Sequence, residues 1–216
     1  MEWKEVGLEG SRYNASLTFG LLQDGSGYYF ETTVNPIDAD MYWNPTTHAY
    51  FNLGGSDSDP GDQLLTIPAE NILETDQNMI PTGEAVPAGE VDFSTERKTG
   101  DSNLDYYFVL SASEWDGLVT KTEFEQKIRD GVKLAHVATL RHPATGIVMD
   151  VTSNVFGVQV FNGWEKRVAI EPMTMPPNAI NLEQFREGAI ARRGQTYVQR
   201  TECRFSLSPA ENFPIG

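Results

Sequence analysis

The segment YVQRTECRFSL, residues 197–207, carries the pattern that decides the fold class. Its apolar side chains alternate with charged ones, with Tyr197, Cys203, Phe205 and Leu207 set against Arg200, Glu202 and Arg204. Successive side chains of a β-strand point to opposite faces of its sheet. The alternation therefore predicts a strand near the end of the sequence with one buried face and one face in water.

The same period of two recurs in two predicted hairpins. In the first, residues 16–19 and 28–32 alternate around the turn QDGSG. In the second, the even-numbered residues from Leu134 to Leu140 share one face, His136 among them, and another strand follows the turn-like HPATG. Both segments favour antiparallel strands.

Helix signals are few, and the best are SASEWDG, residues 111–117, and NLEQFREGA, residues 181–189. Residues 60–100 are rich in Pro and Gly, which predicts ordered loop between short strands. Many short strands with few helices predict a mainly β fold, an antiparallel sandwich or barrel. A chain of 216 residues can form one such domain, expected over residues 1–216.

The formal net charge of −15 limits the classes of partner. Phosphate backbones and anionic lipid surfaces are held mainly by Lys and Arg, so nucleic acid and membrane surfaces are not expected partners. Cys203 is the single cysteine, which excludes an internal disulfide, and no run of about 18 apolar residues occurs. With no apolar stretch in MEWKEVGLEG, we expect a soluble cytoplasmic protein.

Four residues in polar clusters are candidates for chemistry, and each also has a purely structural interpretation. His48 lies in TTHAYFNLGG, residues 46–55, where a hydrogen-bonded structural histidine is the commoner case. Asp105 is either a strand-start aspartate or a ligand for a polar molecule. Gln159 points away from Val158 and Val160, toward solvent or a binding cleft.

Glu171 is the sharpest of these candidates. It follows the apolar run 168–170 and precedes Pro172, a context that buries or partly buries its carboxyl group. Burial would raise the pKa of Glu171 and suit it to general base catalysis, whereas a salt bridge to Arg167 or Arg141 would explain the same position.

Metal and nucleotide chemistry lack a sequence signal. The three histidines have no ligand spacing, His142 precedes Pro143 in a turn, and a lone cysteine builds no thiolate site. Gly-rich phosphate loops and a nucleophile-elbow serine are missing from the sequence. We therefore expect no metal ion, and neither nucleotide chemistry nor acyl transfer.

Taken in order, five segments resemble the aldose 1-epimerase, or galactose mutarotase, family. They are THAYFNLGG, LTIPAENILETDQNMIPTGEAVPAGEVDFS, LDYYFVL, TGIVMDVTSNVFGVQVFNGW and AIEPMTMPPNAIN, and the resemblance runs from about residue 14 to residue 207. It implies an antiparallel β-sandwich of the galactose mutarotase type, incomplete at the N-terminus.

The resemblance also implies an activity and a site. The family interconverts α and β anomers of free hexoses such as galactose or glucose without a cofactor. Glu171 would act as general base on the anomeric hydroxyl and His48 as general acid on the ring oxygen. Asp105 and Gln159 would hold sugar hydroxyls. Tyr50 and Asn52 are further expected sugar contacts, and Trp164, like Tyr50, would pack on the sugar's apolar face or fill core.

The sequence also departs from the family pattern. An N-terminal section with an arginine, an asparagine and a second histidine in a His-Gly-Gly-like element is not matched, and Tyr106 stands where a histidine often follows the aspartate. We expect a truncated or naturally short member, or a site completed by another chain, and unpaired strand edges favour a homodimer. The rival functions are a non-catalytic sugar-binding module and a hexose-6-phosphate mutarotase, for which Arg192 and Arg193 are the basic pair.

Overall fold

Two antiparallel sheets form the body of the computed structural model, which describes residues 2–3, 11–101, 103–111, 113–115 and 117–208. The nine-stranded sheet has the order β1 (Glu2–Trp3), β2 (Tyr13–Leu21), β3 (Gly27–Pro36), β17 (Tyr197–Leu207), β13 (Ile147–Ser153), β12 (Ala135–Arg141), β6 (Leu64–Thr66) and β9 (Arg97–Lys98), with β11 (Val119–Thr120) paired to β17. The six-stranded sheet has the order β5 (Tyr50–Phe51), β15 (Arg167–Met173), β14 (Gly157–Trp164), β10 (Asp105–Val109), β7 (Asn71–Thr75) and β8 (Pro81–Pro87).

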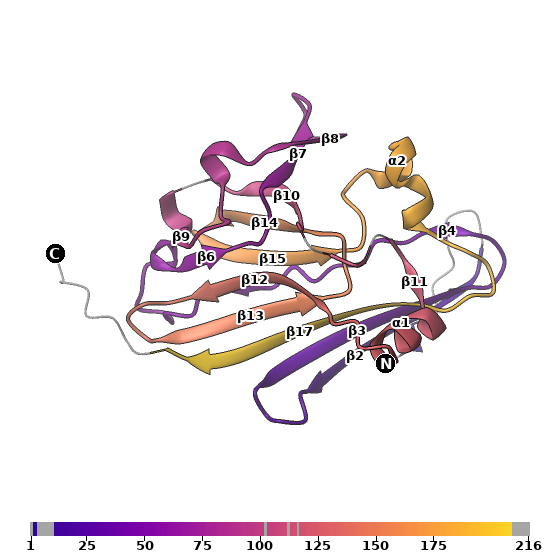
Figure 1. The fold of residues 1–216 in the computed structure, drawn as a ribbon, viewed down its shortest axis with the longest axis horizontal. Helices are drawn as coiled ribbons and strands as arrows, with labels where there is room; N and C mark the ends of the chain where they lie inside the picture. The colour runs from indigo at the N-terminus through magenta and orange to yellow at the C-terminus, as the bar shows by residue number, and fades with distance from the viewer. Residues whose placement is uncertain (1, 4–10, 102, 112, 116, 209–216) are drawn as a thin grey trace.

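Smaller elements connect these strands. They are the strand pair β4 (Met41–Tyr42) and β16 (Ile190–Ala191), the helices α1 (Lys121–Arg129) and α2 (Glu183–Arg186), and the 3-10 turns η2 (Pro60–Asp62), η3 (Gly89–Val91), η4 (Thr99–Asp101), η5 (Ala179–Asn181) and η6 (Glu187–Ala189). Figure 1 shows β14 and β15 of the smaller sheet above β12, β13 and β17 of the larger one. In the part of the chain described, no helix is long and apolar enough to cross a membrane.

The main core lies between the two sheets. Alternate residues of β12 and β13, such as Leu140 and Met149, are fully buried, and so are Phe108, Val158 and Val160 of the facing sheet. Removing each such side chain from water stabilises the fold by about 1.5–3 kcal/mol. The predicted mainly β sandwich is confirmed.

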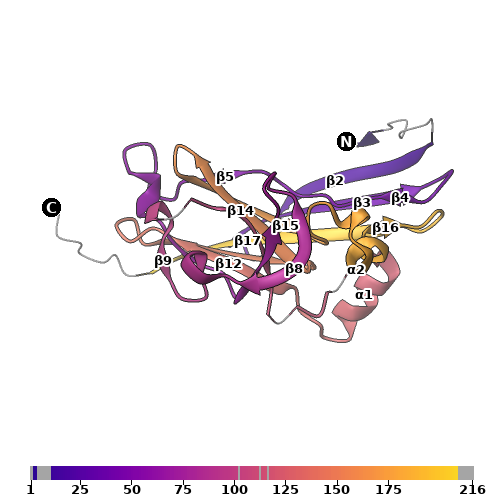
Figure 2. The same cartoon turned by 90° about the horizontal axis from the view of Figure 1, so that it is seen from above.

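The first predicted hairpin is confirmed, since β2 and β3 pair from Tyr13 opposite Pro36 to Leu21 opposite Tyr28. The β2 half of its apolar face is in solvent, however, with Leu17 51%, Phe19 67% and Leu21 78% exposed, whereas Phe30 of β3 is buried. In Figure 1, β3 and β2 lie below β17, on the side of the larger sheet away from β14 and β15, and Figure 2 shows β2 displaced from them as well.

The expectation of a fully buried apolar face on residues 197–207 is therefore wrong at one end of the strand. Tyr197 and Cys203 are buried as predicted, but Phe205 is 37% and Leu207 79% exposed. Sequence alternation fixes which side chains share a face, whereas burial also requires a second layer above that face. These two residues lie at the C-terminal end of β17, where Phe205 meets Tyr28 of β3 with ring centroids 6.0 Å apart.

The second predicted hairpin is formed by β12 and β13, but one detail of its pattern is wrong. A bulge between His136 and Ala138 shifts the register, so that His136 is exposed while Val137, Ala138 and Leu140 are buried. One extra residue in a strand reverses the side to which the preceding side chains point. His136 therefore does not share the face of Ala138 and Leu140.

The helix predictions have mixed outcomes. Residues 183–186 form α2, flanked by 3-10 turns, as expected for NLEQFREGA. The described part of SASEWDG is not helical, and residues 112 and 116 lie outside the described residues. Instead α1 begins just afterwards, where Thr120 and Glu123 form a capping box, a signal present in the sequence. The ordered loop with short strands expected over residues 60–100 is confirmed.

Candidate active site

One face of the six-stranded sheet collects the predicted polar residues. Gln159 of β14 lies opposite both Glu171 of β15 and Tyr107 of β10, and Asp105 lies opposite Phe161. Paired residues share a face in an antiparallel sheet, and side chains two apart on one strand do so too. Their neighbours along the strands fill the core, which turns these polar groups to the opposite face of the sheet.

Glu171 and His48 make the closest acid–base contact on this face. The distance between His48 Nε2 and Glu171 Oε1 is 3.2 Å, with Glu171 7% exposed and the His48 side chain half exposed. Burial raises the pKa of Glu171, the charge of His48 acts to lower it, and the Asp105 carboxylate raises it further. A base with a raised pKa and a neighbouring imidazole can exchange protons with a bound molecule.

The salt-bridge explanation for Glu171 is not what the structure shows. Arg167 lies 3.2 Å from Glu165, and Arg141 binds Glu96 through two hydrogen bonds. The described ionic partner of Glu171 is His48, which the sequence could not pair with it.

Asp105 and Gln159 form a second polar pair. The Gln159 side-chain amide donates a hydrogen bond of 2.7 Å to Asp105 Oδ1. Asp105 is the first residue of β10 and is exposed, so it satisfies the strand-start interpretation while presenting its second oxygen to solvent. A cavity of about 200 Å³ adjoins the pair and is also lined by Tyr107, Met79 and Pro81.

Aromatic rings border the histidine. Tyr50 lies 4.9 Å from His48 between ring centroids, and Trp164 lies 4.8 Å from Tyr50 at 75°. Phe161 approaches both His48 and Tyr50 edge-on, at 6.2 and 6.4 Å. Phe161 was not among the residues predicted from the sequence, although its place two residues after Gln159 puts it on the same face.

Asn52 has a different environment from the other candidates. Its amide nitrogen donates to the carbonyl of Gly55 at 2.7 Å, and its oxygen accepts from Gly54 N and Ser58 Oγ. These bonds close the loop after β5. They give Asn52 a structural role, and its sugar contact stays a prediction.

Three buried or clamped amide side chains hold the site segments and were missed by sequence reasoning. Gln63 is fully buried, accepts from Leu53 N at 2.7 Å and donates to the Phe51 carbonyl at 3.1 Å. Asn44 exchanges two hydrogen bonds with the backbone of Met175, tying the loop before His48 to the segment after β15.

Asn162 acts in the same way at β10. Its side-chain oxygen accepts from Leu104 N at 2.8 Å, and its nitrogen donates to the Thr99 carbonyl at 2.9 Å. Leu104 directly precedes Asp105, so this bond fixes where β10 begins. Nothing in the sequence pattern relates these amides to backbone partners so distant along the chain.

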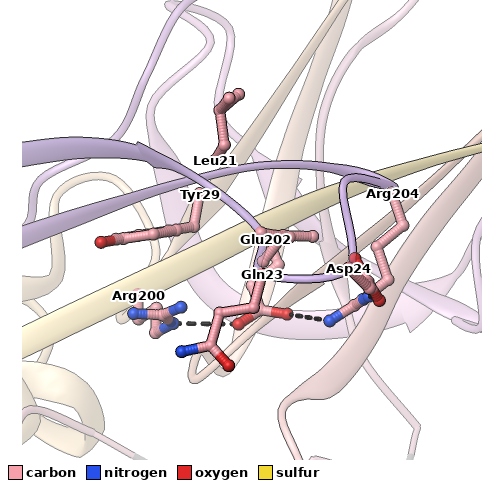
Figure 3. A pocket seen from close by; sticks show the side chains of 8 residues that line it. Leu21, Gln23, Asp24, Tyr29, Arg200, Glu202 and Arg204 are labelled. Carbon is pink, nitrogen blue, oxygen red and sulfur yellow. Dashed lines mark hydrogen bonds and ion pairs between the residues drawn. The ribbon is translucent and has the colours of Figure 1, made fainter.

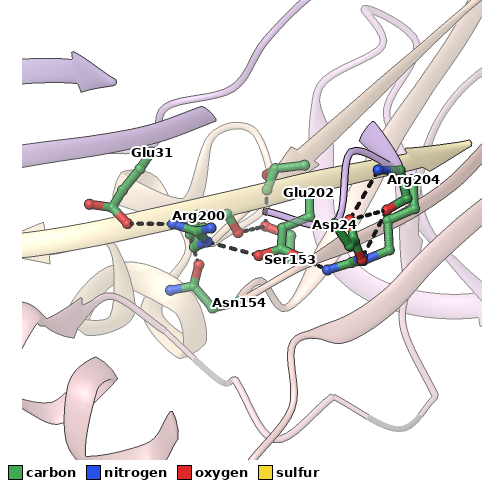
Figure 4. A network of polar contacts seen from close by, with 9 residues as sticks. Asp24, Glu31, Ser153, Asn154, Arg200, Glu202 and Arg204 are labelled. Atoms are coloured by element: carbon green, nitrogen blue, oxygen red, sulfur yellow. Dashed lines mark hydrogen bonds and ion pairs between the residues drawn. The ribbon is translucent and has the colours of Figure 1, made fainter. Parts of the chain in front are cut away.

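The outer face of the larger sheet carries a charged hollow of about 710 Å³, lined by Leu21, Asp24, Tyr29, Arg200, Glu202 and Arg204 (Figure 3). Its two guanidinium groups are paired: Arg200 with Glu31 and Glu202, and Arg204 with Asp24 and Glu202 (Figure 4). Hydrogen bonds from Ser26 and Arg204 lower the pKa of Asp24 to about 2. Three carboxylates around two guanidiniums leave no surplus positive charge for an anion.

Of the predicted phosphate-binding pair, Arg192 is engaged through its guanidinium and Arg193 through its backbone. Arg192 forms ion pairs with Asp40 and Glu187, and the backbone N–H of Arg193 donates to Asp40. Among the described residues, no group of three or more His, Cys, Asp or Glu side chains is arranged to hold a metal ion.

Comparison with known proteins places this site in context. The model of the family described as aldose 1-epimerase matches residues 8–204. Galactose mutarotase of Mus musculus is 27% identical over 184 residues, covering 76% of this chain and 50% of that protein. The Homo sapiens galactose mutarotase is 28% identical over 182 residues with the same coverage. Maltose epimerase of Levilactobacillus brevis is 37% identical over 81 residues, 37% of this chain and 24% of that protein.

The chain thus spans about half the length of the galactose mutarotases it matches. Solved structures share its fold. An aldose epimerase homologue from C. elegans superposes with a TM-score of 0.73 at 20% identity, covering 92% of this chain and 62% of that one. The galactose 1-epimerase of Lactobacillus acidophilus superposes with a TM-score of 0.70 at 14% identity, covering 92% and 58%.

Proposed function

The chain belongs to the aldose 1-epimerase family, and from this premise we propose that it interconverts the α and β anomers of free hexoses such as galactose or glucose. The observation that carries the proposal is the contact of 3.2 Å between His48 Nε2 and Glu171 Oε1, on a sheet face that also holds Asp105 and Gln159. Anomer interconversion needs one base and one acid acting together on a polar ring, and this pair supplies both.

The proposed reaction is two proton transfers in each direction. Glu171 removes the proton of the anomeric hydroxyl, the bond between the anomeric carbon and the ring oxygen breaks, and His48 Nε2–H protonates that oxygen. The open-chain aldehyde rotates about the bond next to its carbonyl carbon. Closure reverses the two transfers and returns Glu171 and His48 to their starting protonation states.

The raised pKa of Glu171 supports its role in this scheme. A general base works best when its pKa is near the operating pH, and burial moves the Glu171 carboxyl in that direction. Asp105 would accept hydrogen bonds from sugar hydroxyls with its free oxygen, and the Gln159 amide would hold that carboxylate in place. Fixed hydroxyls keep the anomeric centre within reach of both catalytic groups.

Polarimetry on freshly dissolved α-D-glucose and α-D-galactose tests the proposal. We expect faster mutarotation than in buffer, abolished by Glu171→Gln and His48→Asn and retained by Glu125→Gln. Glu125 is a matched control because its carboxylate is exposed on α1, 3.9 Å from Arg129. Wild-type rates equal to buffer would refute catalysis, and sugar binding without acceleration would identify the non-catalytic binding module instead.

The same assay separates free sugars from hexose 6-phosphates. Phosphate recognition needs uncompensated cations, whereas Arg192, Arg200 and Arg204 are each paired with carboxylates. We expect glucose to be the better substrate when compared with glucose 6-phosphate. A clear preference for the phosphorylated sugar would reverse that ranking.

We further propose that a second copy of the chain covers the exposed apolar face of β2. Leu17, Phe19 and Leu21 lie on one side of that strand, and the Phe19 ring stacks on Tyr28 at 5.1 Å. Exposed contiguous apolar side chains favour association. Light scattering during size-exclusion chromatography should give a dimer mass that Phe19→Lys reduces to the monomer. A wild-type monomer across the concentration range would contradict this. The cytoplasmic location stays a prediction.

A further inference from the structure

The site face continues past the catalytic pair toward the β14–β15 hairpin. Along β15, Glu171, Ala169 and Arg167 are spaced two residues apart and share one face. Tyr50 and Phe161 lie opposite Ala169, and Trp164 lies opposite Arg167. The small side chain of Ala169 is thus framed by two aromatic rings, and the row ends at a Trp–Arg pair.

This row is longer than one sugar ring. Arg167 lies four positions before Glu171 along β15, which is about 13 Å at about 3.3 Å per residue. A six-membered ring built from bonds of about 1.5 Å does not reach from one end to the other. A hexose whose anomeric carbon lies at Glu171 would leave Trp164 and Arg167 free for another group.

The end of the row is both exposed and held in place. Trp164 is 50% exposed although it is a large apolar side chain. The Tyr50 ring contacts it at 4.8 Å between centroids, and the Arg167 guanidinium lies over its ring at 5.1 Å. Glu165 lies 3.2 Å from Arg167. Preorganised side chains bind a ligand with less loss of conformational freedom.

The backbone of the hairpin adds to this rigidity. Glu165 and Lys166, the two residues between Trp164 and Arg167, have φ values of 51° and 57°. Two successive positive φ values give the tight hairpin turn that is usually made with Asn and Gly. The turn keeps Trp164 directly opposite Arg167 at the end of the site face.

The chemistry of this end matches a pyranose ring. A sugar presents C–H groups on its faces and hydroxyls at its rim, and aromatic rings with a few placed polar groups bind such amphipathic surfaces. Trp164 offers apolar area, Arg167 offers N–H donors, and Glu165 offers carboxylate acceptors. The donors and acceptors are charged, which strengthens hydrogen bonds to hydroxyls.

We infer that Trp164 and Arg167 form a second sugar subsite, and that the protein favours reducing disaccharides over single hexoses. The reducing ring lies against Glu171 and His48 with its anomeric hydroxyl free, and the ring linked to it lies on Trp164. The inference rests on the proposed function for the first ring, but the second subsite is a binding property that can be measured without turnover.

Sugar binding measured by calorimetry tests the subsite directly. The probes are maltose, lactose, glucose and galactose, and the proteins are wild type, Trp164→Ala, Trp164→Phe and Ile128→Ala. Ile128 is a control because it is 43% exposed on α1, so its truncation also removes exposed apolar surface. We expect a disaccharide to bind at least fivefold tighter than its reducing hexose, Trp164→Ala to remove that advantage, and Trp164→Phe to keep part of it.

The outcomes separate the two levels of the proposal. A disaccharide advantage lost only in Trp164→Ala supports the subsite even if no protein accelerates mutarotation, in which case the catalytic proposal alone fails. Equal affinity of wild type for hexose and disaccharide overturns the subsite, as does equal weakening of both by Trp164→Ala. Absence of sugar binding by the wild type overturns it too.

Discussion

Replacing Glu171 with glutamine removes a carboxylate while keeping the length and nearly the shape of the side chain. In the folded protein that carboxylate is 7% exposed and lies 3.2 Å from His48 Nε2. A glutamine amide can keep a hydrogen bond to the imidazole but cannot take a proton from an anomeric hydroxyl. The substitution therefore removes the proposed base and preserves the surrounding geometry.

The size of the loss follows from the position of the group. A positioned general acid or base contributes about 10²–10⁴-fold to rate. Because Glu171 is buried and its pKa is raised, we expect the upper half of this range. A loss of about 10³–10⁴-fold in kcat corresponds to about 4–5 kcal/mol at about 1.36 kcal/mol per factor of ten. KM should change less than about threefold, since the retained contacts bind ground and transition states alike.

Polarimetry gives kcat and KM, and urea denaturation gives the free energy of unfolding. We expect the free energy of unfolding of Glu171→Gln to lie within about 1 kcal/mol of the wild-type value. The substitution loses an ion pair to a half-exposed imidazole, but it also removes the cost of burying a charge, and the two effects oppose each other. A kcat loss under tenfold would refute the base assignment. An equal loss in Glu125→Gln would show that the effect is not specific to the site.

Three further outcomes follow from the structure. Because burial raises the pKa of Glu171, kcat/KM should rise with pH through that raised value. The folded state also binds the Glu171 proton more tightly than the unfolded state does. The stability that this proton contributes is therefore full below the unfolded pKa and is lost as pH rises through the folded pKa. Urea denaturation should show Glu171→Gln gaining on the wild type between pH 4 and pH 7, and a constant difference would contradict the sign. Combining Glu165→Asn with Lys166→Gly should stabilise the protein by about 1 kcal/mol, because Asn and Gly adopt positive φ with less strain and the two exposed ion pairs that are lost, Glu165–Arg167 and Lys166–Asp59, contribute little. An unchanged denaturation midpoint would contradict it. Gln63→Met should cost about 1–3 kcal/mol by leaving backbone groups beside β5 unbonded, and a midpoint equal to wild type would show that they find other partners.

The alternation of apolar and polar side chains along the strands predicted much of the architecture. Alternation around Val158, Gln159 and Val160 was enough to put the glutamine on the face opposite the core, and the apolar run before Glu171 was enough to predict its burial. Whether the face of Gln159 was solvent or cleft depended on the pairing of β14 with β15 and β10, which a single strand does not encode.

Other features needed tertiary information. The loop that leads to His48 is tied to the segment after β15 by the bonds of Asn44 to the backbone of Met175, a pairing between distant segments that no local rule predicts. The exposure of Phe19 depends on where the second layer ends, since an alternating strand looks the same with or without a covering sheet. The helix α1 is different, because its capping box of Thr120 and Glu123 is a local signal present in the sequence.

The two-residue alternation of β14 and β15 has a consequence for how this chain tolerates insertions and deletions. Val158 and Val160 are buried in the core, so one added residue beside Gln159 would turn either a valine toward water or the glutamine into the apolar core. The same insertion at the 165–166 turn would leave both sheet faces as they are and change only the position of Trp164 at the end of the hairpin. Strand interiors here should accept length changes in pairs or not at all, whereas the hairpin tip should accept them one residue at a time.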